Sequence, residues 1–282
     1  MSVLVAPARP RGRLSPARLG LYALLVVLGV FYLTPIFAII ITSLKSAAEL
    51  ARTTVWDMPM SPSLESYATA FQALAPSFFN SVYLVVPATL VSAFLGSMNG
   101  YVLAKWKFKG ANLIFTLLLF GMFIPYQSVL IPLVQLLTSI NLYGGIPGLI
   151  LVHIVYGIPI CTLIFRNYYA GVPKELLEAG RIDGASVLGI YRHILLPLSV
   201  PGFVVVLIWQ FTSIWNEFLF AVTISGNNQP ITVALVNLAG SIAPQPNVQM
   251  AGALLAAVPT LLVYILLGRY FVRGLLAGSL KG

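Results

Sequence analysis

The sequence predicts an all-α integral membrane protein with six transmembrane helices. Of its 282 residues, 59% are hydrophobic and only 8% are charged, and the mean hydropathy is +0.94. A soluble domain usually has about a quarter of its residues charged. The charges also gather in short blocks, and the stretches between these blocks exceed the ~20 apolar residues that cross a bilayer as a helix. Lipid rather than water is therefore the predicted solvent for most of the surface.

Six spans follow in order from the apolar runs that carry almost no charge. A lead of residues 1–18, rich in Pro, Arg and Ala, precedes the first run and is expected to be disordered. The first run is too long for the 7–15-residue core of a signal peptide, so we expect it to be retained. The predicted spans are Leu19–Leu44, Asn80–Ala104, Ala111–Leu137, Ile146–Phe165, Leu198–Ile224 and Met250–Gly268. Residues 19–271 thus form the predicted transmembrane domain, and residues 272–282 form a cytoplasmic tail.

The basic residues orient these spans. An even number of spans places both termini on one side, and fourteen of the sixteen Lys and Arg fall on that side, with only Lys45 and Arg52 opposite. Because Lys and Arg are retained in the cytoplasm, we predict an N-in, C-in topology. The net charge of +9 is spread over separate blocks rather than along one face, which argues against a nucleic-acid partner.

Three further features concern packing and the outer segments. Gly96 and Gly100 form a small-xxx-small pair that predicts the close approach of another helix. A short helix is expected after Ser61, with Pro62 at its first position, running through Glu65–Leu74. The almost uncharged segment Ser225–Gln249 has two open interpretations, which are contact with another protein and folding back on its own bundle.

The cytoplasmic segment between the fourth and fifth spans is the most informative. Lys174–Ile182 is a good helix former, and Asp183-Gly184 indicates a helix end, where glycine adopts the left-handed turn readily. Leu176, Ala179 and Ile182 recur on one face, beside charges of both signs. Helices that bind lipid surfaces usually carry mostly basic polar faces, so the mixed charge favours a protein partner.

The same segment resembles the EAA loop of binding-protein-dependent ABC importers, E-A-A-x3-G-x9-I-x-L-P. The chain has Glu178-Ala179-Gly180, then Gly184, Ile194 and Leu196-Pro197 at the same spacing, with Gly180 as the one departure. Trp215–Phe218 and the ending Gly274–Gly282 are similar to the smaller permease of maltose-type carbohydrate importers.

This resemblance implies a type I ABC importer permease fold whose loop, residues 171–197, carries a cytoplasmic coupling helix. The implied partners are two ATPase subunits, a second and larger permease, an extracytoplasmic sugar-binding protein and lipid, in a prokaryotic cell membrane. By match to the motif, the residues coupled to the ATPase are Glu178, Ala179, Gly180, Asp183, Gly184, Ala185, Ile194, Leu196 and Pro197. The tail residues implied to touch the ATPases are Gly278, Lys281 and Gly282.

The sequence lacks the G-x-x-x-x-G-K-[ST] phosphate loop, so ATP and Mg²⁺ are expected on partner subunits, and this chain is expected to bind no cofactor or metal. It also lacks a G-x-S-x-G elbow and an H-E-x-x-H pair, so we do not expect an enzyme. The resemblance implies a mono- or oligosaccharide as the solute, and the stretch at residues 229–235, which is similar to glucose/mannose-type importers, favours that type. The alternatives are a stand-alone secondary transporter, which would need ion-coupling groups inside the membrane, and an ABC permease for a non-sugar solute.

Glu217 is the one acidic residue within a predicted span. A carboxylate at membrane depth is by default a functional-site hypothesis. Asn99, Gln127 and Asn216 join it as candidates for a polar translocation path, although hydrogen bonds between helices are the commoner role of such side chains.

Overall fold

The fold consists of helices, most of them joined by short connections. The computed structural model describes residues 16–240 and 245–279, with residues 271–279 described through their backbone only, and no strand occurs in these ranges. In chain order the elements are α1 Pro16–Ser43, α2 Ala47–Leu50, α3 Glu65–Lys105, α4 Ala111–Phe120, η1 Gly121–Phe123, α5 Tyr126–Ser139, α6 Ile146–Ala170, α7 Lys174–Ile182, α8 Val187–Ile190, η2 Tyr191–Leu195, α9 Leu196–Leu198, α10 Val200–Trp215, α11 Leu219–Ile224, α12 Ile231–Ala239 and α13 Pro246–Ser279.

Four of these helices, α1, α3, α6 and α13, are long and apolar enough to cross a membrane, and two bent pairs bring the total to as many as six. The third predicted span is not one continuous helix: α4–η1 and α5 form a bent pair that meets at 99°. Pro125 stands at the start of α5 with an extended backbone, ψ 133°, and this ends the preceding helical turn. The predicted fifth span is also interrupted: it begins in α9, bends into α10 and stops after Trp215 before α11.

The helix that contains the second span is longer than predicted. Residues Glu65–Leu74 are helical, as predicted, but they continue without a break into the span and form one helix of 41 residues. The helix begins at Glu65 instead of at Pro62, so the predicted start was wrong. At 1.5 Å per residue α3 is about 60 Å long, which exceeds a hydrocarbon core of about 30 Å.

Other boundaries move outward. The fourth span extends through α6 to Ala170, and the sixth begins at Pro246. The helix α13 continues to Ser279, past residue 272, where we expected a separate tail to begin. Gly278 lies in the last turn of that helix, whereas Lys281 and Gly282 lie outside the described residues. Most of the expected lead, residues 1–15, also lies outside them, and α1 begins at Pro16.

The centre of the bundle is the packing of α3 against α6. The predicted role of Gly96 and Gly100 in close helix packing is confirmed. A Cβ on Gly96 would overlap the side chain of Cys161, and a Cβ on Gly100 would lie 2.7 Å from Cβ of Phe165. Only glycine lets the backbones of α3 and α6 approach this closely.

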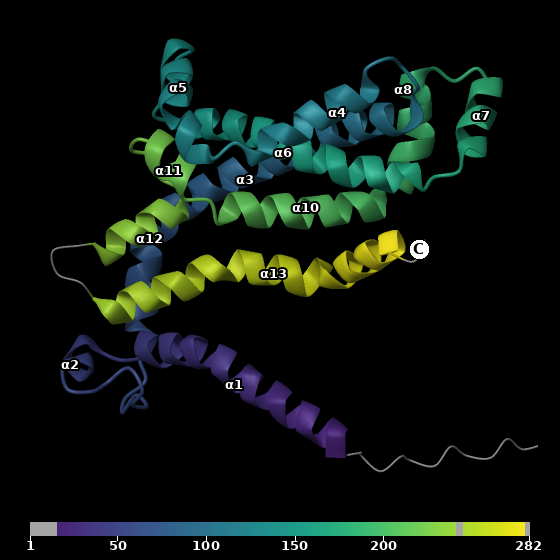
Figure 1. Cartoon of the computed structure of the whole chain (residues 1–282). Helices are drawn as coiled ribbons and strands as arrows, with labels where there is room; N and C mark the ends of the chain where they lie inside the picture. Colours follow the sequence, from purple (N-terminus) through teal and green to yellow (C-terminus); the bar gives the residue numbers. More distant parts are fainter. Residues whose placement is uncertain (1–15, 241–244, 280–282) are drawn as a thin grey trace, which may run out of the picture.

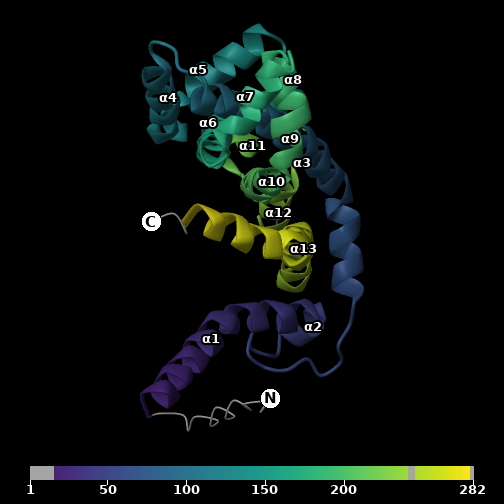
Figure 2. The same cartoon turned by 90° about the vertical axis from the view of Figure 1, so that its right-hand side faces the viewer.

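The remaining spans pack around this pair. Helix α10 packs on α3, α6 and α13, and α1 packs on α13. Most of α1 faces away from the other helices (Figures 1 and 2), and its apolar side chains, such as Val26 and Phe31, are exposed. Exposed apolar residues along a span are typical of a lipid-facing or subunit-facing surface.

The segment after α11 folds back on its own bundle. Helix α12 packs against α3 and α13, and Ile231 and Val233 are buried. Ser81 on α3 accepts a hydrogen bond from the backbone N–H of Ile231 at 2.8 Å. This resolves the open interpretation for α12, while residues 241–244 of the same segment lie outside the description.

The two ends of the bundle differ in what they present. Helices α7 and α8 and the C-terminal end of α13 lie at one end, at the right of Figure 1, and α2, α11 and α12 lie at the other. Figure 2 looks onto the first of these ends. The segments that the basic residues predicted to be cytoplasmic are therefore together at one end of the molecule.

Candidate functional site

The predicted coupling segment, residues 171–197, contains α7, whose bounds Lys174–Ile182 match the predicted helix. Its end is fixed by Gly184, which has φ +77°. The N–H of Ala185 donates to the carbonyl of Gly180 at 2.9 Å, and the N–H of Gly184 donates to that of Arg181 at 3.0 Å. This pair of bonds is a Schellman motif, which satisfies carbonyls that the helix end leaves free. The predicted helix stop at Asp183-Gly184 is therefore confirmed.

The two faces of α7 have different neighbours. Leu177 and Gly180 are buried against the chain, whereas Leu176 is 42% exposed and Ile182 is 87% exposed. The predicted apolar row thus points away from the bundle. Glu178 lies on the exposed side. An exposed apolar row beside charges of both signs is typical of a protein contact surface.

Gly180, the departure from the EAA pattern, has a packing role in this fold. A Cβ at this position would lie 2.7 Å from Cδ1 of Ile194 and 3.4 Å from Cγ1 of Ile190. Glycine therefore lets α7 lie directly against the segment that follows it. Two EAA-motif positions separated by 14 residues, Gly180 and Ile194, meet at this contact, which the linear pattern does not reveal.

The connection from α7 to the fifth span is short and capped. The Oγ of Ser186 accepts from the N–H of Gly189 at 3.1 Å and begins α8. The chain then passes through a π-helical turn, η2, to Leu196 and Pro197 of α9. Single π-helical turns within helices are frequent at functional sites.

Buried hydroxyl groups and rings join this segment to the bundle. The hydroxyls of Ser97 and Tyr169 lie 2.6 Å apart, and the Tyr191 hydroxyl donates to Ser97 Oγ at 3.0 Å. Tyr101 stacks on Tyr191 with ring centroids 5.8 Å apart. Near the other end of the segment, Lys105 Nζ donates to the carbonyl of Val172 at 2.6 Å. The predicted coupling segment is therefore joined to α3 and α6 by hydrogen bonds and ring contacts.

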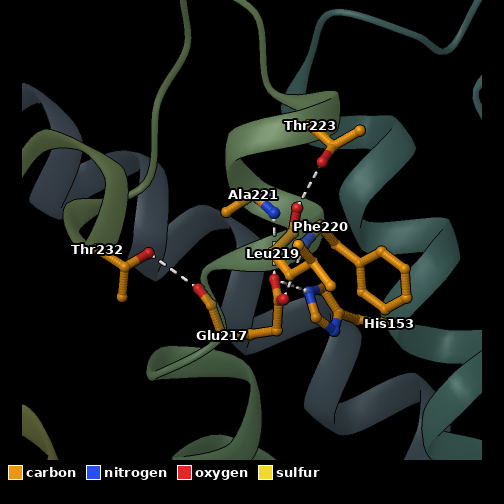
Figure 3. Close-up of polar contacts among 7 residues, drawn as sticks. All are labelled: His153, Glu217, Leu219, Phe220, Ala221, Thr223 and Thr232. Carbon is orange, nitrogen blue, oxygen red and sulfur yellow. Dashed lines mark hydrogen bonds and ion pairs between the residues drawn. The ribbon is translucent and has the colours of Figure 1, made fainter. Parts of the chain in front are cut away.

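A second polar centre lies at the opposite end, where the fifth span is interrupted (Figure 3). Glu217 accepts from the backbone N–H of Phe220 at 2.8 Å and from that of Ala221 at 3.1 Å. These are free donors of the first turn of α11. The carbonyl of Glu217 also accepts from Thr232 Oγ1 at 2.8 Å, which joins α12 to the interruption. The carboxylate is thus used to shape the broken span.

His153 is the residue that sequence reasoning did not connect with Glu217. Its Nε2 lies 3.7 Å from Oε2 of Glu217 and has no hydrogen-bond partner among the described residues. Its ring contacts Phe220 edge to face, with centroids 6.0 Å apart. The two residues are 64 positions apart, and only the packing of α6 beside α11 brings them together, so no local pattern could have found the pair.

The four candidate path residues do not converge. No hydrogen bond joins any two of Asn99, Gln127, Asn216 and Glu217 in the part of the chain that the structure describes. Asn216 donates to the carbonyl of Thr212 at 2.8 Å within its own helix end. Gln127 is exposed in the first turn of α5. Their role in a translocation path stays a prediction.

The structure combines helices that are long and apolar enough to span a membrane with a short helix, α7, whose outer face is exposed at one end of the bundle. Comparison with known proteins identifies its family. Residues 92–276 match the family described as binding-protein-dependent transport system inner membrane component. The chain belongs to this family and is a multi-pass membrane protein.

Curated relatives cover nearly the whole chain. A probable ABC transporter permease protein of Pyrococcus horikoshii is 46% identical over 96% of this chain and 99% of its own length. The xylose/arabinose import permease protein XacI of Haloferax volcanii is 38% identical over 92% of each chain. The glucose import system permease protein GlcU of Saccharolobus solfataricus is 32% identical over 93% of this chain and 95% of its own.

A solved structure shares the fold. A chain of a bacterial ABC transporter involved in the import of the acidic polysaccharide alginate matches with a TM-score of 0.77 at 21% identity. The match covers 94% of this chain and 100% of that chain. The predicted ABC importer permease fold is thus confirmed.

Proposed function

We propose that the chain is one permease subunit of an ATP-driven importer that carries a mono- or oligosaccharide across a prokaryotic cell membrane. A second permease completes the pathway, two ATPase subunits bind and hydrolyse ATP, and an extracytoplasmic binding protein delivers the solute. Membership of the binding-protein-dependent family supports the need for these partners. A solved complex of the alginate transporter with its periplasmic protein is a further precedent for the last of them.

The observation that carries the proposal is the geometry of α7. Its inner face, Leu177 and Gly180, is packed on the chain, and its outer face leaves Leu176 and Ile182 exposed among the described residues. A nine-residue helix is too short to be stable alone in water. The buried Tyr191–Ser97–Tyr169 contacts then connect a force on α7 to the central α3–α6 pair. We propose that the ATPases dock on α7 and move the bundle through it.

The proposed orientation places α7, α8 and the end of α13 in the cytoplasm. The basic residues support it, because fourteen of sixteen belong to segments predicted on that side. The outer end, with α2 and α12, then faces the binding protein. Labelling of single cysteines in sealed vesicles tests this topology, since the one native cysteine, Cys161, is buried.

The sugar class rests on the relatives. XacI and GlcU are import permeases for xylose/arabinose and for glucose, and both align over more than nine-tenths of this chain. A non-sugar solute is the second candidate, and it is favoured by the osmoprotective compounds uptake permease protein GgtD of Synechocystis, which is 31% identical.

The decisive experiment is solute uptake by proteoliposomes that contain the chain with its co-purified partners. We expect uptake of radiolabelled sugar only with the binding protein outside, ATP in contact with the ATPases, and α7 intact. Accumulation of an osmolyte instead of sugars would favour the second candidate. Solute movement by the chain alone, without ATP, would instead identify a secondary transporter.

A further inference from the structure

A pocket of about 580 Å³ lies where α3 ends and α4 begins. Its wall is formed by the connection between these two helices and by the first turn of α4. Gly110, with φ +89°, makes the sharp change of direction that leaves the pocket open. Because α3 is a spanning helix and α4 begins a bent span, the pocket lies at a membrane boundary. It lies beside α7, because the guanidinium of Arg181 is 5.7 Å from the ring centroid of the lining residue Trp106, and it is separate from the centre at Glu217.

The pocket is positively charged. Lys107 and Lys109 line it, no lining residue is acidic, and neither lysine has an ion pair or hydrogen bond with any residue in the described ranges. Arg166 lies behind the pocket, with its guanidinium 4.0 Å from the ring centroid of Phe115 and a hydrogen bond of 3.4 Å to Asn112 Oδ1. The first turn of α4 adds the backbone N–H groups of Asn112 and Leu113, whereas that of Ala111 donates to the carbonyl of Phe108 at 3.3 Å.

Two neighbours give the pocket an amphipathic character. Trp106, at the inner wall, has an indole Nε1 that is buried without an acceptor. Beyond the opening, α4 presents an apolar face, with Leu113 63% exposed and Leu117 62% exposed. Tryptophan and lysine at the end of a span are typical of the interfacial region, and the exposed leucines continue into the hydrocarbon depth.

We propose that this pocket binds the phosphate headgroup of an anionic phospholipid, whose acyl chains lie along the exposed face of α4. The two free lysines and the helix N-terminus recognise the anionic phosphate, which a soluble phosphate ion also offers. The apolar face of α4 favours the lipid as the source, because it contacts acyl chains that a free ion lacks. Basic pockets between spans on the cytoplasmic side are recognised sites for anionic headgroups.

Native mass spectrometry of the purified transporter tests the proposal. Phosphatidylglycerol is titrated against the protein and its Lys107→Gln, Lys109→Gln and doubly substituted variants, with phosphatidylcholine in a parallel series. Arg52→Gln is the matched control, because Arg52 is also exposed but lies outside the pocket. Each lysine near the headgroups is expected to contribute about 5-fold in affinity, and both together roughly 25-fold. The thermal unfolding of each variant confirms that the fold is retained.

The expected result is retained phosphatidylglycerol that is lost in the double variant, preserved in Arg52→Gln, and not displaced by 10-fold excess inorganic phosphate. Equal binding of phosphatidylcholine, or equal retention in the double variant and the control, would overturn the proposal. Displacement of the lipid by phosphate would also overturn it, since the pocket would then select a free anion.

Discussion

The Schellman end of α7 gives a sharp test of the coupling segment through Gly184→Ala. At φ +77° an added Cβ has no atom within 4 Å, so the substitution introduces backbone strain without a clash. The left-handed region costs a residue with a Cβ about 1–2 kcal/mol. In a nine-residue helix this lowers the ratio of the capped to the frayed end by roughly 5- to 30-fold. If only the capped form docks, the affinity for the ATPase falls by up to the same factor.

Gly144→Ala is the matched control for this prediction. Gly144 has φ +86°, also has no atom within 4 Å of an added Cβ, and lies beside α11 at the opposite end of the molecule. The affinity of purified ATPase subunits is measured by fluorescence anisotropy against the permease in nanodiscs. We expect both variants to lose similar thermal stability and only Gly184→Ala to weaken docking. Equal ATPase affinities for the two variants would refute the assignment of α7 as the docking helix.

Three further predictions concern stability. Gly96→Val would overlap Cys161 and should destabilise the fold by about 1–3 kcal/mol through overpacking. Gly29→Val, on the open face of α1, should not destabilise it, and thermal unfolding in detergent distinguishes the two variants. Glu217→Ala removes two hydrogen bonds to the first turn of α11 and should cost about 1–3 kcal/mol in the same assay. Glu217→Gln keeps one acceptor and should cost about half of that, and equal losses would contradict the capping role. Hydrogen bonds from the backbone N–H and the hydroxyl of Thr54 lower the pKa of Asp57. Hydrogen-exchange protection of the Thr54–Asp57 turn should therefore be full above the ordinary aspartate pKa, and it should be lost as the pH falls through the lowered pKa of Asp57. Asp57→Asn should abolish this pH dependence, and an unchanged profile would show that another group is responsible.

The sequence predicts those features that depend on local chemistry. Apolar length located the four continuous spanning helices, and the Asp183-Gly184 pair located the end of α7. The Gly96 and Gly100 spacing indicated close helix packing without naming α6 as the partner. Each of these signals lies within a few residues of the feature that it predicts.

The features that escaped prediction depend on contacts between distant segments. The interruption after Trp215 is an example, because an apolar run gives no sign of a break that is stabilised by Glu217 and by Thr232 of α12. The meeting of His153 with Glu217 and of Gly180 with Ile194 likewise follows from packing. Proline was an ambiguous signal, since Pro125 stands at a 99° bend, whereas Pro87 and Pro159 lie inside continuous helices.

The most direct test of the account is a site-specific crosslink from α7. Ile182 is 87% exposed and the native Cys161 is buried, so Ile182→Cys offers one reactive thiol at the proposed docking face. Val55→Cys, 48% exposed in the outer segment, is the control. In native membranes treated with a bifunctional maleimide–amine reagent, we expect a crosslink from residue 182 to a phosphate-loop ATPase and none from residue 55. A permease that is recovered without any ATPase crosslink from residue 182 would contradict it.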